Sequence, residues 1–175
     1  MKNSPLLIGI TGGIGSGKSL ISSIFNKLGL PVYDADTRAK WLMAHDPNIK
    51  SQLIELLGSE SFTEQGLNRS FIARKSFNNE KILTRLNAMV HPEVGVDFTR
   101  WVALHDSSPV LLKESALIFE TSSHTELDQV ILVLSPSALR IKRVLARDLH
   151  RDKKDIEAII SRQLPAAETS LLAHF

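Results

Sequence analysis

The chain of 175 residues contains no cysteine, which excludes a disulfide framework, a thiolate zinc site and a cysteine nucleophile. It also lacks a long apolar run: stretches such as Val130–Leu134 are far too short to cross a bilayer. The apolar residues 6–10 lead directly into glycines, with no A-x-A-like cleavage site after them, so a signal peptide is not predicted. We therefore expect a cytoplasmic protein that does not bind membranes.

An excess of one charge is also missing. The 21 Lys and Arg residues are nearly balanced by 19 Asp and Glu residues, which leaves a formal net charge of +2. No run of five or six like charges occurs, so the sequence indicates neither a nucleic-acid surface nor a patch for anionic lipids. The remaining composition is ordinary for one globular domain over residues 1–175, and we expect its partner to be a small-molecule substrate.

Short apolar runs alternate with segments of helical spacing. The runs predict four strands at Leu6–Ile10, Leu30–Tyr33, Val110–Lys113 and Gln129–Leu134. Apolar strands separated by helices are typical of an α/β fold with a parallel sheet flanked by helices on both faces.

The connection between the second and third predicted strands is too long for a simple crossover, and its helical pieces indicate an inserted subdomain. We therefore predict a nucleotide-binding core in residues 5–35 and 108–136, a helical acceptor subdomain in 36–107 and a lid region in 137–165. Within the helical part, Asp46-Pro47, Gln65-Gly66 and His91-Pro92 are interpreted as turns. Trp41 and Trp101 follow helical apolar patterns, so both are expected in the core or in a pocket wall.

A glycine-rich stretch after the first predicted strand is the most informative segment. It matches the phosphate-loop pattern G-x-x-x-x-G-K-[ST] in Gly12, Gly13, Ile14, Gly15, Ser16, Gly17, Lys18 and Ser19. Glycines let successive backbone N–H groups approach one phosphate, and the following helix adds the positive end of its dipole. Lys18 would neutralise the outer phosphates and the Ser19 hydroxyl would bind Mg²⁺. A plain connecting turn needs only one or two glycines, so the segment predicts a nucleoside triphosphate with Mg²⁺.

Two classes of phosphate-loop protein are excluded by missing motifs. A guanine-nucleotide switch needs Asp-x-x-Gly and Asn-Lys-x-Asp, and neither occurs. An ATPase motor usually has an apolar strand that ends in adjacent acids, which is also missing. A small kinase remains, and it needs a base, a basic lid and an acceptor pocket.

The base is sought among acids at the carboxyl ends of the predicted strands, because these ends share one edge of a parallel sheet with the phosphate loop. Asp34 and Asp36 follow the second strand, where a carboxylate could orient or deprotonate an acceptor hydroxyl, although either could simply cap the next helix. Glu114 ends the third strand, where it could order magnesium-bound water or form a surface ion pair.

The lid is sought on the helix after Pro136, which carries Arg140, Arg143 and Arg147. Arginines that close over the γ-phosphoryl group would neutralise charge in the transition state. The alternative is an exposed basic face paired with nearby aspartates. His91 precedes a proline in a helical region and by itself indicates a helix start.

Several motifs occur in a characteristic order: Thr11 to Ser19; Asp34-Ala35-Asp36; Leu86-Asn87 with His91-Pro92; Leu117-Ile118-Phe119-Glu120; Ser135-Pro136 with Arg143 and Arg147-Asp148; and Gln163, Pro165 and Glu168. This order resembles the bacterial dephospho-CoA kinase family over essentially the whole chain. The resemblance implies a P-loop NTPase fold similar to adenylate kinase, with a helical CoA-binding domain and a mobile lid. It also implies the last step of coenzyme A synthesis, in which ATP phosphorylates the ribose 3′-hydroxyl of dephospho-CoA.

The resemblance further implies roles for individual residues. Lys18 and the loop amides would hold ATP, Asp34 would be the base, and Arg143 would reach the reaction from the lid with Arg147 in support. The acceptor side would include Asp36, Arg69 and His91.

The chain departs from the family pattern at three places. Leu20 stands where the family has threonine at the end of the nucleotide-binding loop, which should be harmless because Ser19 supplies the hydroxyl. Ala116 replaces a proline. The family pattern continues into a further strand and helix, whereas this chain ends at Phe175, so we expect a fifth strand and part of the adenine pocket to be missing. Two alternatives stay open: a small P-loop kinase for a nucleotide or nucleoside, and a nucleotide-binding module without turnover.

Overall fold

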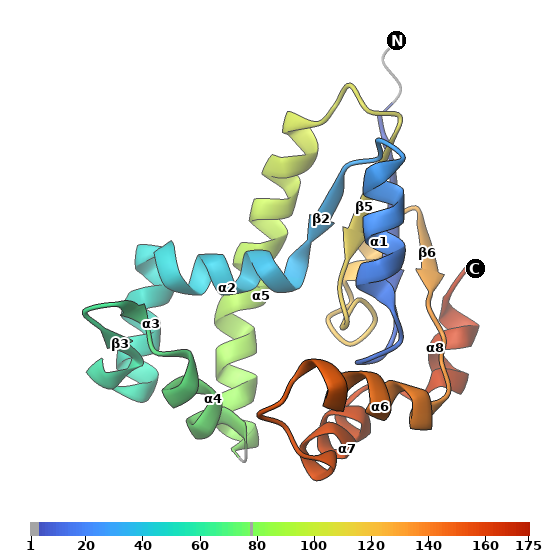
Figure 1. Ribbon diagram of the computed structural model, residues 1–175. Helices are drawn as coiled ribbons and strands as arrows, with labels where there is room; N and C mark the ends of the chain where they lie inside the picture. The colour runs from blue at the N-terminus through green and yellow to red at the C-terminus, as the bar shows by residue number, and fades with distance from the viewer. Residues whose placement is uncertain (1–3, 78) are drawn as a thin grey trace. The chain divides into compact units, whose positions relative to one another are not determined.

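A parallel β-sheet forms the core of one of two compact units in a computed structural model that describes residues 4–77 and 79–175 (Figure 1). Its strands are β1 (Leu6–Thr11), β2 (Val32–Asp34), β5 (Val110–Glu114) and β6 (Gln129–Leu132), in the order β2-β5-β1-β6. All three strand pairs are parallel. The four strands predicted from apolar runs are therefore confirmed, with ends shifted by one or two residues.

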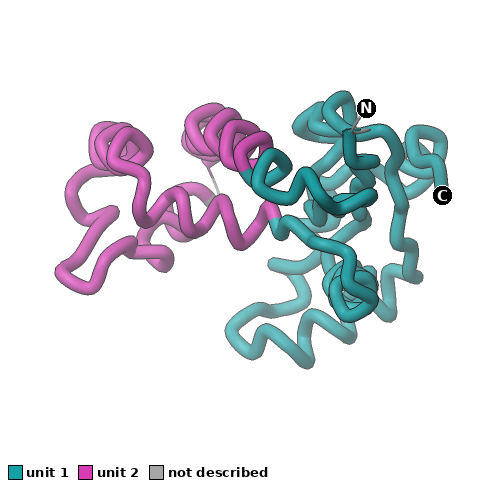
Figure 2. Tube along the Cα trace, turned by 90° about the horizontal axis from the view of Figure 1, so that it is seen from above, with its two compact units in different colours: residues 1–34, 101–175 teal, residues 35–100 magenta. Residues whose placement is uncertain are grey.

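The sheet belongs to a compact unit of residues 1–34 and 101–175 (Figure 2). Its helices are α1 (Lys18–Lys27), α6 (Ser137–Arg147), α7 (Lys153–Arg162) and α8 (Ala166–Leu172), with a short 3₁₀ turn η2 (Ser123–Glu126) before β6. Leu111 and Leu112 are both almost fully buried although neighbouring residues of a strand face opposite sides. Apolar cover on both faces explains why these strands are continuous hydrophobic runs in the sequence.

The end of the chain lies beside the edge strand β6. After α8, the His174 N–H donates to the Val130 carbonyl at 2.9 Å, and the Leu132 N–H donates to the Phe175 carbonyl at 2.8 Å. Ala173 and Leu164 pack against a buried cluster of Ile118, Phe119 and Val130. The last residues are thus tied to the sheet by both backbone hydrogen bonds and apolar contacts.

Residues 35–100 form the second compact unit, which is mainly helical. Its elements are α2 (Ala35–His45), α3 (Pro47–Leu57), the 3₁₀ turn η1 (Ser59–Ser61), a hairpin of β3 (Phe62–Thr63) and β4 (Gly66–Leu67), α4 (Arg69–Phe77) and most of α5 (Glu80–Leu104). Asp46 caps α3 by accepting hydrogen bonds from the N–H groups of Asn48 and Ile49, both at 2.9 Å. The turn at Asp46-Pro47 is confirmed, and Gln65-Gly66 lies in the hairpin.

Two predictions for this part of the chain are wrong. His91-Pro92 is not a turn, because α5 continues through Pro92. Val90, Val94 and Phe98 are buried at helical spacing on both sides of the proline, and this packing offsets an interior proline's cost of about 3 kcal/mol. The other is the core position of Trp41, because 45% of its surface is exposed; the pocket wall, its alternative, stays a prediction.

Trp41 is instead held at the surface by its neighbours on α2. The guanidinium of Arg38 lies 4.5 Å from its ring centroid, and the ring of His45 stacks on it at 4.5 Å. These residues are spaced three and four positions from Trp41, which places them on one helix face. None of the helices in the described part of the chain is long and apolar enough to span a membrane.

Candidate active site

The phosphate loop has the backbone shape that its glycines predict. Gly12, Gly15 and Gly17 adopt φ angles of +146°, +76° and +107°, a region that other L-residues rarely enter. Helix α1 begins immediately afterwards at Lys18, so its first unpaired N–H groups and the positive end of its dipole lie at the loop. This backbone shape and the helix start are the features that an anion-binding loop requires.

Lys18 lies within this loop. The residue is only 9% exposed, and its Nζ donates to the carbonyls of Gly12 at 2.8 Å and Gly13 at 3.4 Å. These contacts hold the ammonium group against the first residues of the loop. A buried cation at this place complements a bound phosphate strongly because little water screens it.

Ser19 and Glu114 meet at the carboxyl end of the sheet. The Ser19 Oγ donates to the Glu114 Oε1 at 2.8 Å, and Glu114 is buried at the end of β5. The described residues contain no group of three or more His, Asp or Glu side chains that could hold a metal ion. This pair fits a Mg²⁺ ion whose remaining ligands are phosphate oxygens and water, because Mg²⁺ usually keeps several waters and few protein ligands.

Asp34 ends β2 beside this pair. Asp34 is in register with Glu114, and Glu114 is in register with Ile10 at the end of β1. Residues in register on neighbouring strands lie about 4.8 Å apart and face the same side of a sheet. Asp34 is exposed, whereas Glu114 is buried. The fold thus places the predicted base and the phosphate loop at one sheet edge.

The predicted lid arginines have different partners. Arg143 Nη1 donates to the carbonyls of Gly15 at 3.4 Å and Ser16 at 3.2 Å, so it lies on the phosphate loop. Arg147 pairs instead with Asp148, at 2.8 and 3.1 Å. These hydrogen bonds raise the pKa of the Arg147 guanidinium and hold the pKa of the Asp148 carboxyl below its usual value. Arg143 is therefore with the loop in this structure, and Arg147 is not.

Ile14 and Leu20, which are also predicted to bind the nucleotide, donate their backbone N–H groups to other residues of the protein. The Ile14 N–H donates to Gln163 Oε1 at 2.9 Å. The Leu20 N–H donates to the Gly17 carbonyl at 3.1 Å, and the Leu20 side chain is 65% exposed. Contacts of Ile14 and Leu20 with a nucleotide remain predictions.

The residues predicted for the acceptor side lie on three helices of the unit formed by residues 35–100. Asp36 is in the first turn of α2, and Arg69 is the first residue of α4. His91 is half-buried in the middle of α5, and burial lowers its pKa because a charged imidazole loses hydration there. Their roles in acceptor binding remain predictions.

Stability should decrease with acid because of His91. A group whose pKa is lower in the folded chain binds fewer protons there than in the unfolded chain, so it stabilises the fold above the unfolded pKa of about 6.5 and loses this effect as pH falls. We expect the Tm of the wild type to fall more between pH 7.5 and 5.5 than that of His91→Gln. Thermal unfolding in matched buffers would test this, and parallel Tm curves for the two proteins would contradict it.

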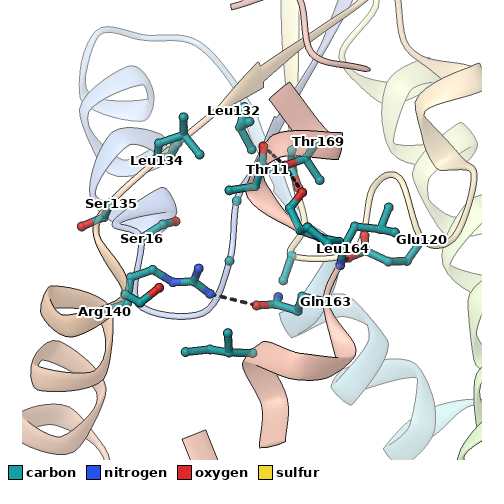
Figure 3. Close-up of a pocket in the computed structure, with 18 of the residues that line it drawn as sticks. Thr11, Ser16, Glu120, Leu132, Leu134, Ser135, Arg140, Gln163, Leu164 and Thr169 are labelled. Carbon is teal, nitrogen blue, oxygen red and sulfur yellow. Dashed lines mark hydrogen bonds between the residues drawn. The ribbon is translucent and has the colours of Figure 1, made fainter. Parts of the chain in front are cut away.

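A pocket of about 270 Å³ opens beside the loop, within the unit that contains the sheet (Figure 3). Its walls come from the loop, the end of β6, and α6, α7 and α8, and they include Gly13, Ser16, Glu120, Arg140 and Gln163. The Glu120 carboxylate accepts a hydrogen bond from the Leu164 N–H at 3.0 Å, which joins the segment after β5 to the connection between α7 and α8.

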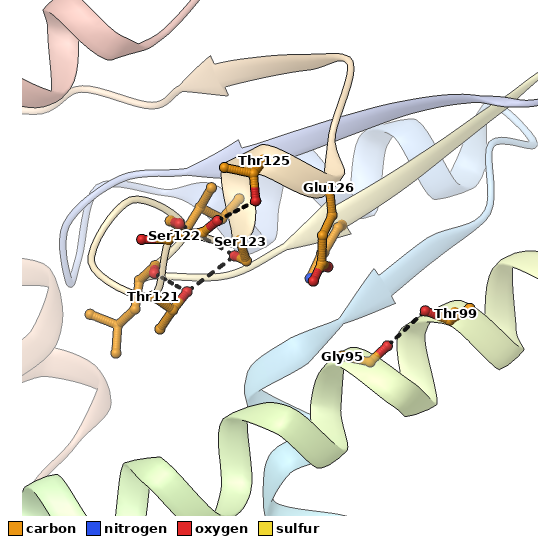
Figure 4. A network of polar contacts seen from close by, with 10 residues as sticks. Gly95, Thr99, Thr121, Ser122, Ser123, Thr125 and Glu126 are labelled. Atoms are coloured by element: carbon orange, nitrogen blue, oxygen red, sulfur yellow. Dashed lines mark hydrogen bonds and ion pairs between the residues drawn. The ribbon is translucent and has the colours of Figure 1, made fainter.

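The segment between β5 and β6 is stabilised by its own hydroxyl groups (Figure 4). Thr121 Oγ1 donates to Ser123 Oγ at 3.1 Å, and Thr125 Oγ1 donates to the Ser122 carbonyl at 2.9 Å. The buried Lys113 of β5 forms an ion pair with Glu126 at 3.2 Å, which compensates its charge. These contacts bind the segment to itself and to β5.

Arg140 and Gln163 make contacts with the phosphate loop that the sequence did not predict. Arg140 was expected to close over a phosphoryl group, but its Nε donates to the Ile14 carbonyl at 2.9 Å. Gln163 entered only as part of the family resemblance. The contacts join residues 126 and 149 positions apart, and no local pattern signals them.

Comparisons with known proteins agree with this geometry. The family profile of dephospho-CoA kinase matches residues 6–175. The chain belongs to the dephospho-CoA kinase family. A Porphyromonas gingivalis dephospho-CoA kinase is 42% identical over 143 residues, which cover 82% of this chain and 70% of the relative. The Leptospira interrogans enzyme of the same name is 40% identical over 163 residues, with 93% and 78% covered. The family predicted from the motif order is confirmed.

Solved structures confirm the fold class. A crystal structure of a Thermus thermophilus protein superposes with a TM-score of 0.84 at 32% identity, covering 98% of this chain and 86% of that one. A Campylobacter jejuni dephospho-CoA kinase superposes with a TM-score of 0.69 at 23% identity, covering 97% and 85%, which supports the fold alone. The prediction of a P-loop kinase fold with a parallel sheet is therefore correct.

Proposed function

We propose that this chain catalyses the reaction for which its family is named, the transfer of the γ-phosphoryl group of ATP to the ribose 3′-hydroxyl of dephospho-CoA. The products are CoA and ADP, and the step is the last of coenzyme A synthesis. The observation that carries the proposal is the common sheet edge at which the loop, the Ser19–Glu114 pair and Asp34 lie. The matching family profile supports the choice of acceptor.

The loop and its lysine bind and orient the triphosphate in this proposal. The backbone donors between Gly12 and Lys18 surround the inner phosphates, and Lys18 Nζ moves from the loop carbonyls to the outer phosphate oxygens. Ser19, next to Glu114, is the residue that would hold Mg²⁺, which neutralises phosphate charge when bound. These groups mainly position and stabilise charge, and phosphoryl transfer needs little else from a protein.

Asp34 acts on the acceptor. Its carboxylate accepts the proton of the 3′-hydroxyl, or orients that hydroxyl for in-line attack, and either role needs a heavy-atom distance of about 3 Å. Arg143, already on the loop carbonyls, supplies positive charge to the transferring group. Asp36, Arg69, His91 and Arg147 are proposed as supporting residues on the acceptor and nucleotide sides.

An acceptor comparison tests the proposal. The purified chain is supplied with Mg-ATP and with dephospho-CoA, its 3′-deoxyribose analogue, AMP, CMP or uridine, and ADP release is coupled to a spectroscopic readout. We expect ADP and CoA in equal amounts with dephospho-CoA and no turnover with the 3′-deoxy analogue. Turnover only with a nucleotide or nucleoside would contradict dephospho-CoA as the acceptor. ATP binding without any ADP release would contradict the proposed kinase activity.

A further inference from the structure

Arg140 and Gln163 are hydrogen-bonded to each other beside the phosphate loop (Figure 3), and both also bind Ile14 of the loop. Arg140 Nε donates to the Ile14 carbonyl at 2.9 Å, and the Ile14 N–H donates to Gln163 Oε1 at 2.9 Å. Arg140 Nη2 closes the ring by donating to the same Gln163 oxygen at 3.2 Å. Both polar backbone groups of Ile14 are therefore bonded to the helical segment of residues 137–163.

The loop is shaped to admit this arginine. A Cβ atom at Gly13 would overlap the Arg140 guanidinium, and one at Gly15 would lie 2.6 Å from the Arg140 carbonyl oxygen. Gly13 does not have a left-handed φ, so its backbone conformation alone does not require glycine. The space beside Gly13 is needed for Arg140.

The charge of Arg140 also bears on the loop. Its two hydrogen bonds go to an amide and a carbonyl oxygen, which carry no formal charge. Burial lowers the pKa of its guanidinium, which nevertheless stays protonated because arginine is charged at any physiological pH. No carboxylate among residues 4–77 and 79–175 forms an ion pair with Arg140, and a half-buried cation of this kind favours an anion in the adjacent loop.

We infer that Arg140 and Gln163 are positioning residues of the ATP site, which keep the phosphate loop in its binding shape through Ile14. A loop with four glycines has much conformational freedom to lose, and fixing it before ATP arrives removes part of that entropic cost from binding. Gln163 thereby fixes the directions of the neighbouring loop N–H groups, and Arg140 adds its charge. This role rests on the proposed use of ATP.

The first test replaces Gln163 and measures Mg-ATP affinity by calorimetry without any acceptor. Gln163→Leu removes the shared acceptor, and we expect the Kd for Mg-ATP to rise about 10- to 100-fold, in line with the effect of small misplacements of a binding group. Lys142→Ala, which removes an exposed cation from the same α6 helix, is the matched control and should bind ATP normally.

Two further measurements separate positioning from a merely structural role. Gln163→Leu should raise KM for ATP and leave KM for dephospho-CoA and the Tm nearly unchanged. A large fall in Tm with both KM values raised would identify a structural role and overturn the inference, as would wild-type affinity for ATP in Gln163→Leu.

A double-mutant cycle tests independently whether Arg140 contributes to Mg-ATP binding. Gly13→Ala should weaken Mg-ATP binding about 10-fold or more in the wild type, because the new methyl group displaces Arg140, and should add little in an Arg140→Ala background. Equal effects in both backgrounds would overturn the inference. These readouts need no acceptor, so they can succeed even if dephospho-CoA is not the substrate, whereas absence of ATP binding in the wild type would refute both proposals.

Discussion

Asp34→Asn is expected to lower turnover about 10²- to 10⁴-fold, the range of a lost general base, while Mg-ATP binding stays close to that of the wild type. Asparagine has nearly the same shape but cannot accept the hydroxyl proton. Asp34 is exposed at the end of β2 and in register with Glu114, so the change should disturb neither the sheet nor the Ser19–Glu114 pair. Initial rates with dephospho-CoA and calorimetry with Mg-ATP measure the two quantities separately.

Asp46→Asn provides the control for Asp34. It makes the same chemical change at the cap of α3, where asparagine caps as well as aspartate, so turnover should stay within about twofold of the wild type. Asp36→Asn distinguishes the two acids that the sequence left open. A larger loss of turnover in Asp36→Asn than in Asp34→Asn would transfer the role of base to Asp36, and normal turnover in Asp34→Asn would exclude Asp34.

Lys18→Ala should lower turnover about 10²- to 10³-fold, comparable with the loss of one charge-stabilising donor at an active site. The expected cause is loss of a buried cation from the loop, since Lys18 is 9% exposed and donates to Gly12 and Gly13. Lys18→Arg should also fail, because a planar guanidinium is larger and cannot replace a compact ammonium between two loop carbonyls. Steady-state kinetics and Mg-ATP titrations of the three proteins give the measurement.

Lys27→Ala is the matched control, because Lys27 is the exposed last residue of the same helix. Its turnover should equal that of the wild type within about twofold, as for most surface substitutions. Full activity in Lys18→Ala would show that the cation is not used in the transfer. Restored activity in Lys18→Arg would show that positive charge alone suffices and would contradict the need for a compact ammonium.

Much of the core could be predicted from the sequence because its signals are local. The apolar runs of β1 and β5 identify strands that are buried on both faces, and Gly17 followed by Lys18 marks the start of α1. Pro92 shows where this reasoning fails. A proline disfavours a helix locally, but burial of Val90 and Val94 on one continuous face of α5 outweighs that preference.

The candidate site likewise contains residues that local sequence patterns predicted and contacts that they did not. Lys18 was predicted from the phosphate-loop pattern, and Asp34 because it follows a strand end and parallel topology brings strand ends together. For Glu114 the sequence left two roles open, ordering magnesium-bound water and a surface ion pair, and it did not predict the hydrogen bond from Ser19. Arg147 looked equivalent to Arg143 by helical spacing, but the aspartate beside it provides a nearer partner.

The sequence alone determined the phosphate loop, the parallel α/β class and the family. Their signals are local, as in the loop, where the glycines, the lysine and the serine stand in one contiguous segment. Only the tertiary structure decided that Arg140 and Gln163 form hydrogen bonds with Ile14 and that Glu114 accepts a hydrogen bond from the Ser19 hydroxyl. These partners are 95 to 149 residues apart, so their distances depend on how helices and strands pack rather than on any local pattern.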